Sequence, residues 1–346
     1  MFTQAQSDAV LKRYDTSRLS FATVGSHSAL DICQGAKYID CTINNRDSTA
    51  ASKGFHTVVI AKDGREKTYN KYFRTRTRPG YAAPLGVVDT TIVVKEWKDI
   101  IGKDIYGRDV VSMLDILNAI MVIHRSSEVY MKHDLLESFP LPTFGNRSLY
   151  RAEERTGEQK LEKNQDFLAK EAGLPVPKRF DSPEDLDGNT LAIVKSNKAI
   201  GPRGFERDFP RIRTKTDYID ALNKSLQRAS SPDERIAIEK SFKEAPIQEF
   251  IEGPQINLNF FYSKIWDELE LLGTDKREQF PLPSGDEATH IYNSPRESLI
   301  EKAYDMGERF LAITKKYYPP GIIGPFSLQC IGDGSEKLRV IDISLR

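Results

Sequence analysis

Short apolar runs alternate with amphipathic stretches in the first part of the chain. Leu19–Val24, Thr57–Ala61, Thr91–Val94 and Ala119–Ile123 have the length of short buried strands. The stretch from Ala29 to about Lys37 predicts a helix between the first two runs. Strands that alternate with helices are typical of a parallel, doubly wound sheet. We therefore predict an α/β fold here.

The last hundred residues or so have a different pattern. Gln255–Phe261 alternates, with apolar residues on one face and asparagines on the other, which predicts a strand. Arg296–Tyr317 has apolar residues at spacings of three and four, as in an amphipathic helix. Phe326–Ile331 and Lys337–Leu345 read as two strands joined by the turn Gly332–Gly334, which predicts a hairpin.

Between these regions the pattern is interrupted by prolines. Phe139–Pro142 contains two prolines and predicts a boundary between domains. Leu149–Ala172 is a charged stretch that predicts a helix, closed by a glycine and a proline. Leu191–Lys195 predicts a short strand with a lysine at its end, and the polar stretch Asn44–Ser52 predicts an inserted loop.

Composition narrows the class of protein. The 346 residues, 39% of them hydrophobic, suffice for two or three packed layers or subdomains. Lys plus Arg equals Asp plus Glu at 50 each, which argues against nucleic acid or an anionic membrane as the main partner. Cys33, Cys41 and Cys330 are too scattered for a disulfide framework or a zinc site. A polar N-terminus and the lack of a long apolar run predict no signal peptide, no membrane span and a cytoplasmic location.

The turn after the first strand is a candidate phosphate site. Gly25-Ser26-His27-Ser28 leads from a strand into a helix, whose first N–H groups have no partner within the helix. Ser26, His27 and Ser28 could add donors to a bound phosphate. In the equally weighted alternative, a serine only caps the helix.

A second candidate is Lys195 with the basic, glycine-bearing loop from Ser196 to Phe205, which includes Arg203. A lysine at the end of a strand followed by such a loop could neutralise the phosphates of a nucleoside triphosphate. The segment taken alone also fits a solvated basic hairpin. Neither the P-loop nor the dinucleotide-binding fingerprint occurs in the sequence.

The C-terminal hairpin is a candidate metal site. Alternation places Ser327 and Gln329 on one face of its first strand, and Asp342 and Ser344 on one face of its second. Arg339 then lies on the opposite face with Ile341, Ile343 and Leu345. Side-chain oxygens on neighbouring strands suit Mg²⁺, which takes a few protein oxygens and completes its shell with phosphate and water. A wet outer face of the sheet explains the same pattern, and the register between the strands stays open.

Several stretches, taken together and in this order, resemble one enzyme family. They are Ala22–Leu30, Lys62–Tyr69, Phe139–Arg147, Phe261–Ser263, Glu268–Gly273 and Pro320–Phe326. Over nearly the whole chain they resemble the archaeal formate-dependent synthetases of 5-formaminoimidazole-4-carboxamide ribonucleotide (FAICAR), which belong to the ATP-grasp superfamily.

The resemblance implies an α/β ATP-grasp fold with an N-terminal doubly wound, Rossmann-like pre-ATP-grasp domain. Residues 1–138 would bind substrate and residues 139–346 would form the ATP-grasp domain. Its first half, 139–250, would contain the phosphate loop, and its second half, 251–346, the metal-site hairpin. The implied activity is ATP- and formate-dependent formylation of 5-aminoimidazole-4-carboxamide ribonucleotide in purine (IMP) biosynthesis. Formate is a poor electrophile, so an acyl phosphate is expected as the intermediate.

The resemblance also assigns roles to single residues. It implies ribonucleotide binding by Ser26, His27, Ser126 and Asn293. It implies ATP binding by Lys195, Arg203, Glu249 and Ile251, and Mg²⁺ or Mn²⁺ binding by Gln329 and Asp342. The expected partners are small-molecule substrates, with no nucleic acid and no membrane, and a homo-oligomer is expected.

Two alternatives stay open. One is an ATP-grasp paralogue that joins a different carboxylate to a different amine, motivated by Arg125 beside Ser126 and by the altered loop Asn197–Arg203. The other is a catalytically silent nucleotide-binding subunit. A panel of substrates separates the first from the family reaction, and binding without phosphate release identifies the second.

Overall fold

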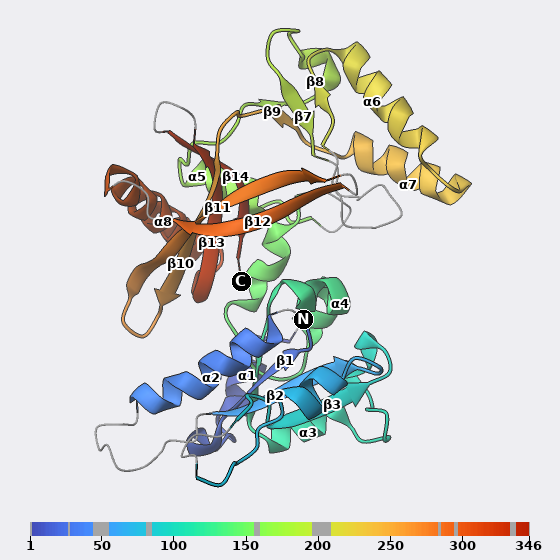
Figure 1. Ribbon diagram of the computed structural model, residues 1–346. Coiled ribbons are helices and arrows are strands. Elements are labelled where there is room, and N and C mark those ends of the chain that lie inside the picture. The colour runs from blue at the N-terminus through green and yellow to red at the C-terminus, as the bar shows by residue number, and fades with distance from the viewer. Residues whose placement is uncertain are drawn as a thin grey trace. The chain divides into compact units, whose positions relative to one another are not determined.

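The computed structural model consists of two compact units. It describes residues 2–26, 28–43, 55–80, 85–155, 160–195, 209–282, 285–293, 297–332 and 337–345, with the backbone alone at 38–43, 277–282 and 285–293. The first unit spans Met1–Arg147 and the second Ser148–Leu345 (Figure 1). Among the described residues, none of the helices combines the length and the apolar character that a membrane span requires.

The first unit is built on a five-stranded parallel sheet of order β3-β2-β1-β4-β5. Its strands are β1 Ser20–Val24, β2 His56–Lys62, β3 Thr90–Val94, β4 Ala119–Val122 and β5 Thr143–Phe144. Its helices are α1 Gln4–Leu11, α2 Ala29–Ile43, α3 Val110–Ile116 and α4 Arg125–Ser138, with 3-10 turns at Thr16–Arg18 and Trp97–Ile101 and a π turn at Thr68–Tyr72. The predicted parallel α/β sheet is confirmed, because each of the four apolar runs forms one of these strands.

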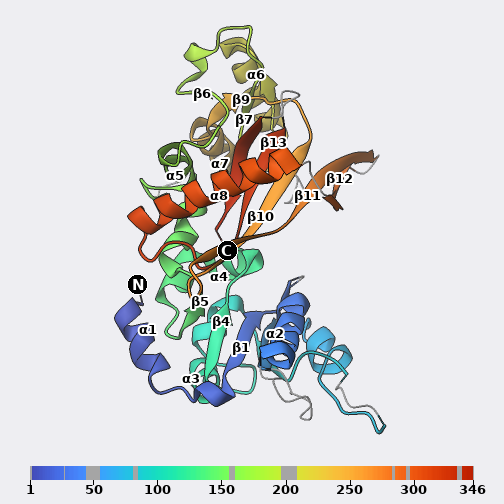
Figure 2. The same ribbon diagram turned by 90° about the vertical axis from the view of Figure 1, so that its left-hand side faces the viewer.

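The order of the strands reverses between β1 and β4. From β1 the chain moves outward to β2 and β3, then returns to β4 on the other side of β1. The turns that follow β1 and β4 therefore lie next to each other, at the carboxyl ends of adjacent parallel strands (Figure 2). In open α/β sheets this switch point is where ligands bind.

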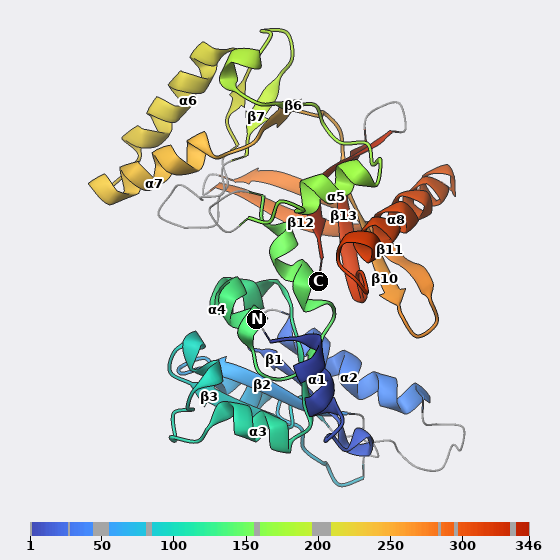
Figure 3. The same ribbon diagram turned by 180° about the vertical axis from the view of Figure 1, so that it is seen from behind.

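The second unit contains two antiparallel sheets. The smaller has the order β6-β9-β7-β8, from β6 Arg179–Phe180, β7 Ala192–Val194, β8 Arg211–Ile212 and β9 Ile247–Glu249. The larger has the order β12-β11-β10-β13-β14, from β10 Gln255–Ser263, β11 Glu268–Leu282, β12 Gly285–Asn293, β13 Gly324–Gly332 and β14 Leu338–Ser344. The helices are α5 Gln165–Glu171, α6 Lys215–Gln227, α7 Pro232–Lys243 and α8 Glu297–Tyr317, with 3-10 turns at Arg147–Glu153 and Pro183–Asp185. Figure 3 shows α6 and α7 beside the smaller sheet.

The core of the larger sheet lies under α8. Phe310 of α8 is fully buried and its ring centroid lies 6.1 Å from that of Phe326 on β13, which stacks on Phe260 of β10 at 5.0 Å. Gly307 lets the helix approach, since a Cβ there would lie 2.8 Å from the Phe260 ring. The predicted amphipathic helix and the C-terminal hairpin are both confirmed.

One predicted helix is wrong. Leu149–Ala172 does not form a single helix, because a 3-10 turn ends at Glu153 and α5 begins only at Gln165. Asn164 starts α5 by accepting hydrogen bonds from the N–H groups of Asp166 and Phe167. Such a cap provides acceptors for helical N–H groups that have no partner within the helix. It therefore favours the start of a new helix over continuation of the preceding 3-10 turn. The predicted loop Asn44–Ser52 lies outside the described residues, and α2 runs to Ile43, beyond the predicted end.

The packing under α8 makes a prediction. Replacing Phe310 with Ala should lower the free energy of unfolding of the second unit by about 3–5 kcal/mol, because a fully buried ring is lost. Calorimetric unfolding measures this. The matched variant Ile265→Ala, at a side chain 87% exposed on the β10–β11 turn, should change it by less than about 0.5 kcal/mol. Equal effects of the two variants would contradict this account of the core.

Candidate active site

Gln329 on β13 and Asp342 on β14 lie directly opposite each other. The register pairs them, which the sequence had left open. The pairing is irregular at this point, since the next pair is Cys330 with Val340, so Ile341 is an extra residue in β14. Such a β-bulge changes which face later side chains occupy.

The bulge corrects one sequence prediction. Arg339 was expected on the face of Ile341 and Ile343, but it pairs with Ile331 and lies on the face of Asp342. Val340 and Ile343 instead occupy the buried face, opposite Cys330 and Leu328. Simple alternation fails because one unpaired residue shifts the side-chain period by one position.

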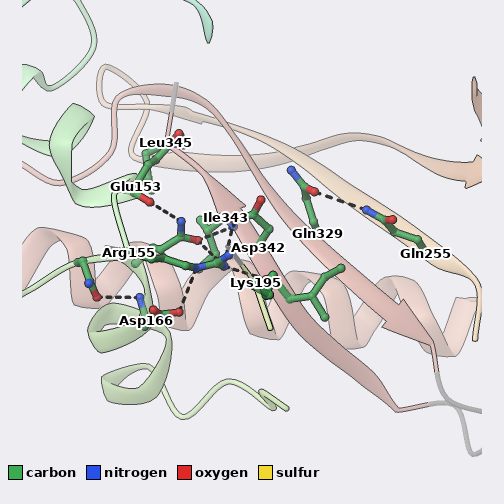
Figure 4. Close-up of polar contacts among 12 residues, drawn as sticks. Glu153, Arg155, Asp166, Lys195, Gln255, Gln329, Asp342, Ile343 and Leu345 are labelled. Carbon is green, nitrogen blue, oxygen red and sulfur yellow. Dashed lines mark hydrogen bonds and ion pairs between the residues drawn. The ribbon is translucent and has the colours of Figure 1, made fainter. Parts of the chain in front are cut away.

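The bulge turns a backbone carbonyl toward two cations. Ile341 O accepts a hydrogen bond from Lys195 Nζ at 2.7 Å and another from Arg155 Nη2 at 2.8 Å. Figure 4 shows the two donors, Lys195 and Arg155, beside Asp342. Lys195 directly follows β7 of the smaller sheet, and its N–H donates to Pro246 O at 3.0 Å. The carbonyl therefore connects the two sheets of the second unit through the predicted ATP lysine.

Arg155 ties the predicted metal ligand Asp342 to α5. Its Nη2 lies 3.0 Å from an Asp342 oxygen and donates to Gln165 Oε1 at 2.9 Å, while its Nε lies 3.2 Å from Asp166 Oδ1. The Arg155 side chain is 13% exposed, so water screens these charges weakly. Neither Arg155 nor Asp166 lies in a recognisable motif, so the sequence alone does not point to them.

Lys195 titrates unusually at this position. Burial lowers its pKa to about 7, the Arg155 guanidinium lowers it further, and the Asp342 carboxylate opposes both. The ammonium is therefore partly neutral at physiological pH. A triphosphate that approached Lys195 would favour the charged form and complete its protonation.

The chemistry of Gln329 and Asp342 fits a hard cation. An amide oxygen and a carboxylate oxygen on neighbouring strands are ligands that Mg²⁺ accepts, with phosphate and water completing its shell. Gln329 Oε1 lies 3.5 Å from Gln255 Nε2. Within the described part of the chain there is no cluster of three or more His, Cys, Asp or Glu side chains arranged for a metal. A cation here would thus depend on the oxygens of its nucleotide.

In the first unit, the turns after β1 and β4 meet through His124. His124 Nδ1 accepts from the Ser126 N–H at 3.2 Å, so a neutral ring carries its proton on Nε2. That nitrogen lies 3.2 Å from Val24 O and 3.5 Å from Ser26 Oγ. The structure thus brings Ser26 and Ser126 to one place, at the end of two adjacent strands. Ser26 Oγ also lies 3.4 Å from the Ser28 N–H, which is the capping contact foreseen as the alternative.

The remaining site predictions concern Glu249, Ile251, Asn293, His27 and Arg203. Glu249 ends β9, where its carboxylate accepts from the Lys178 N–H at 3.1 Å, and Ile251 is buried in the segment that joins the two sheets. Asn293 ends β12 with its backbone paired to Thr274. His27 and Arg203 lie outside the described residues.

Two family models match the chain. Residues 45–180 match a family described as "Protein of unknown function (DUF1246)", and residues 225–346 match a "Domain of unknown function (DUF1297)". Among curated proteins, the chain is 33% identical to the 5-formaminoimidazole-4-carboxamide-1-(beta)-D-ribofuranosyl 5'-monophosphate synthetase of Methanocaldococcus jannaschii, over 97% of this chain and 84% of the relative. It is 32% identical to the synthetase of the same name from Methanopyrus kandleri, over 100% of this chain and 88% of the relative.

Solved structures resemble the chain at lower identity. The IMP biosynthesis protein PurP from Thermococcus kodakaraensis superposes with a TM-score of 0.61 at 24% identity, over 94% of this chain and 85% of that one. The N5-carboxyaminoimidazole synthetase of Staphylococcus aureus, complexed with ADP, gives a TM-score of 0.57 at 12% identity, over 96% and 71%. At these identities the likeness concerns the fold.

The charges around Lys195 make a second prediction. Replacing Arg155 with Met should raise the pKa of Lys195 above its value of about 7, because a cation that disfavours the ammonium is removed while Asp342 and Asp166 remain. NMR of ¹³C-methylated lysines as a function of pH measures this. Arg179→Met is the matched control, since Arg179 also lowers the pKa of Lys195 but less than Arg155 does, and its loss should cause a smaller rise. A Lys195 pKa that stays the same or falls in Arg155→Met would refute this electrostatic account.

Proposed function

Because the chain belongs to the family of 5-formaminoimidazole-4-carboxamide ribonucleotide synthetases, we propose that it joins formate to the exocyclic amine of 5-aminoimidazole-4-carboxamide ribonucleotide in purine biosynthesis, with ATP converted to ADP and phosphate. Family membership, predicted from the sequence, is confirmed by relatives 33% and 32% identical over 97% and 100% of the chain. The ATP-grasp fold and the class of ATP-dependent ligase are confirmed with it.

One observation in the structure supports the reaction most directly. Lys195 and Arg155 both donate to the carbonyl of Ile341, and Arg155 also forms an ion pair with Asp342, which is paired opposite Gln329. Phosphoryl transfer needs cations and a held divalent metal where negative charge develops on the transferred group. Two basic side chains beside two oxygen ligands meet that need.

The chemistry proceeds in two steps. A formate oxygen attacks the γ-phosphorus of ATP, the bond to the β–γ bridging oxygen breaks, and formyl phosphate and ADP result. The amine nitrogen then attacks the formyl carbon, phosphate leaves with the carbon–oxygen electrons, and the nitrogen loses a proton. The first step converts a formate oxygen, a poor leaving group, into phosphate, a good one, and the second step expels that phosphate.

Different residues of the chain contribute to ATP and metal binding in this reaction. Lys195 places its ammonium on the phosphates, and Arg155 orients Asp342 through their ion pair. Gln329 and Asp342 would hold Mg²⁺, which when bound neutralises phosphate oxygens and orients the γ-phosphate. Arg203 would add charge over the phosphates, and the adenine would lie along Glu249–Ile251.

The ribonucleotide would bind in the first unit. Ser26 and Ser126 each contact His124 at the switch point, and α2, a helix of 15 residues, begins just after the first turn. Helix N-termini attract phosphate through their N–H groups and dipole. We assign His27 and Asn293 to the same substrate.

The remaining assignments belong to the same proposal. Residues 1–138 serve as the substrate-binding domain and residues 139–346 as the ATP-grasp domain, with the phosphate loop in 139–250 and the metal hairpin in 251–346. The enzyme acts on small molecules, and we extend the proposal to a cytoplasmic homo-oligomer that uses Mg²⁺ or Mn²⁺.

The function predicts which mixtures release ADP. With Mg-ATP, ADP should accumulate only when formate and 5-aminoimidazole-4-carboxamide ribonucleotide are both present, together with an equal amount of the formylated nucleotide. A coupled ADP assay and mass spectrometry of the nucleotides measure this, with each component omitted in turn.

The other results of this assay decide against the reaction. If other acids or amines alone stimulate ADP release, the paralogue is correct, and the exposed Arg125 beside Ser126 is the first residue to change. If ATP and the ribonucleotide bind but no mixture releases phosphate, the chain is a silent nucleotide-binding subunit.

The depressed pKa of Lys195 predicts a proton linked to nucleotide binding. In the free protein Lys195 has a pKa of about 7, and bound phosphates raise it. At pH 8, Mg-ATP binding should therefore take up about one proton more in the wild type than in Lys195→Met. Well below pH 7 the lysine is already charged, so the difference should vanish. Calorimetry in buffers of different ionisation enthalpy measures it, with Lys243→Met on α7 as a surface control. If wild type and Lys195→Met took up equal numbers of protons at pH 8, Lys195 would not contact the phosphates.

A further inference from the structure

A row of polar residues crosses the larger sheet. The registers pair Asp342 with Gln329, Gln329 with Asn257 and Asn257 with Asp275, so the row runs through β14, β13, β10 and β11. Residues opposite each other on neighbouring strands share one face, about 5 Å apart. Asp275 therefore lies on the face of the two proposed metal ligands, two strands from Gln329.

Asp275 holds two asparagines by their nitrogens. Its Oδ1 accepts from Asn257 Nδ2 and its Oδ2 from Asn259 Nδ2, both at 2.8 Å. Asp275 is 8% exposed and Asn257 is 7% exposed, so these contacts are shielded from water. Hydrogen bonds to a buried carboxylate are stronger than neutral ones.

These contacts fix the polarity of both amides. An ionised carboxylate only accepts hydrogen bonds, so each asparagine must turn its NH₂ group toward Asp275. The carbonyl oxygen of each amide then points away from β11. The strand on the other side of β10 is β13, where Gln329 is paired with Asn257 and Ser327 with Asn259.

The direction of these oxygens matters for a hydrated cation. Mg²⁺ keeps several of its waters, and those waters present hydrogens to their surroundings. An amide oxygen next to Gln329 accepts such a hydrogen, whereas an amide NH₂ group in its place would repel it. Mutation of residues that contact the direct ligands commonly lowers metal affinity by roughly 10- to 100-fold.

We propose that Asp275 is a positioning residue of the cation site: by holding Asn257 and Asn259 through their nitrogens, it turns their oxygens toward β13 and the waters of a divalent cation at Gln329 and Asp342. This inference rests on the proposed function of those two residues as metal ligands. It assigns the polar row a role in binding a hydrated divalent cation, in addition to joining β10 to β11.

The experiment uses Asp275→Asn, which keeps the size of the side chain but lets the amide groups of Asn257 and Asn259 flip. Mn²⁺ binding in the presence of ATP is followed by electron paramagnetic resonance on the full chain. The apparent Kd for Mn²⁺ should rise about 10-fold or more, while the Kd for ATP measured in EDTA stays the same. An unchanged Kd for Mn²⁺ overturns the inference.

A swap of the two groups is the second variant. Asp275→Asn combined with Asn257→Asp restores one carboxylate–amide pair and again places an oxygen toward Gln329. The apparent Kd for Mn²⁺ should return to within about 3-fold of the wild type. A folded double variant that stays as weak as Asp275→Asn also overturns the inference, because charge near β11 would then matter and not the direction of the oxygen.

Asp104→Asn serves as the matched control. Asp104 is a buried carboxylate of the first unit that accepts from two backbone N–H groups and from Arg108. Its loss should lower the melting temperature without changing the Kd for Mn²⁺, and an equal loss of Mn²⁺ affinity in this variant would reduce the Asp275 effect to general destabilisation. Failure of the formate reaction is seen separately, as wild-type protein that binds Mn²⁺ and ATP but forms no formylated nucleotide.

Discussion

The second unit depends on the hydrogen-bond partners of the N–H and C=O groups at the open edge of its larger sheet. β14 is the last strand, and an edge strand leaves a row of N–H and C=O groups that need partners. The Val340 N–H donates to Pro175 O, the Ile341 carbonyl accepts from Lys195 and Arg155, and the Ile343 N–H donates to Gln165 Oε1. The Leu345 N–H donates to the carboxylate of Glu153. The segment before the sheet thus closes its edge, and the same contacts assemble the site.

This arrangement couples stability to charge. Arg155 is enclosed between Asp342 and Asp166, and an ion pair of low exposure is costly to break from one side because the remaining charge stays poorly solvated. Lys195 lies in the same surroundings. Burial and the neighbouring Arg155 disfavour its charged form, so its pKa falls to about 7. In the proposed function, nucleotide phosphates would supply the missing negative charge, so these side chains would be better paired with the ligand than without it.

The sequence predicts the parts of this fold that follow a simple period. The apolar runs became β1 to β4, and the spacing of three and four became α8, because burial of one face decides both. Lys195, Gln329 and Asp342 are site predictions from resemblance and from position on strands, and the structure describes their contacts. The register of Gln329 with Asp342, the bulge at Ile341 and the cluster around Arg155 were not, since they depend on pairing between segments far apart in sequence. The helix predicted over residues 149–172 failed for a local reason, the cap at Asn164.

Because of the bulge at Ile341, the number of residues in β14 determines which of its side chains share a face with Gln329. Deleting one residue there would return the strand to regular pairing and rotate one end of it by a full side-chain step. Either Asp342 would leave the face of Gln329 or Val340 would leave the core. A one-residue gap at this strand in an alignment of related chains is therefore as informative as a substitution of Asp342 itself, and such chains have to be compared by strand register before they are compared by residue identity.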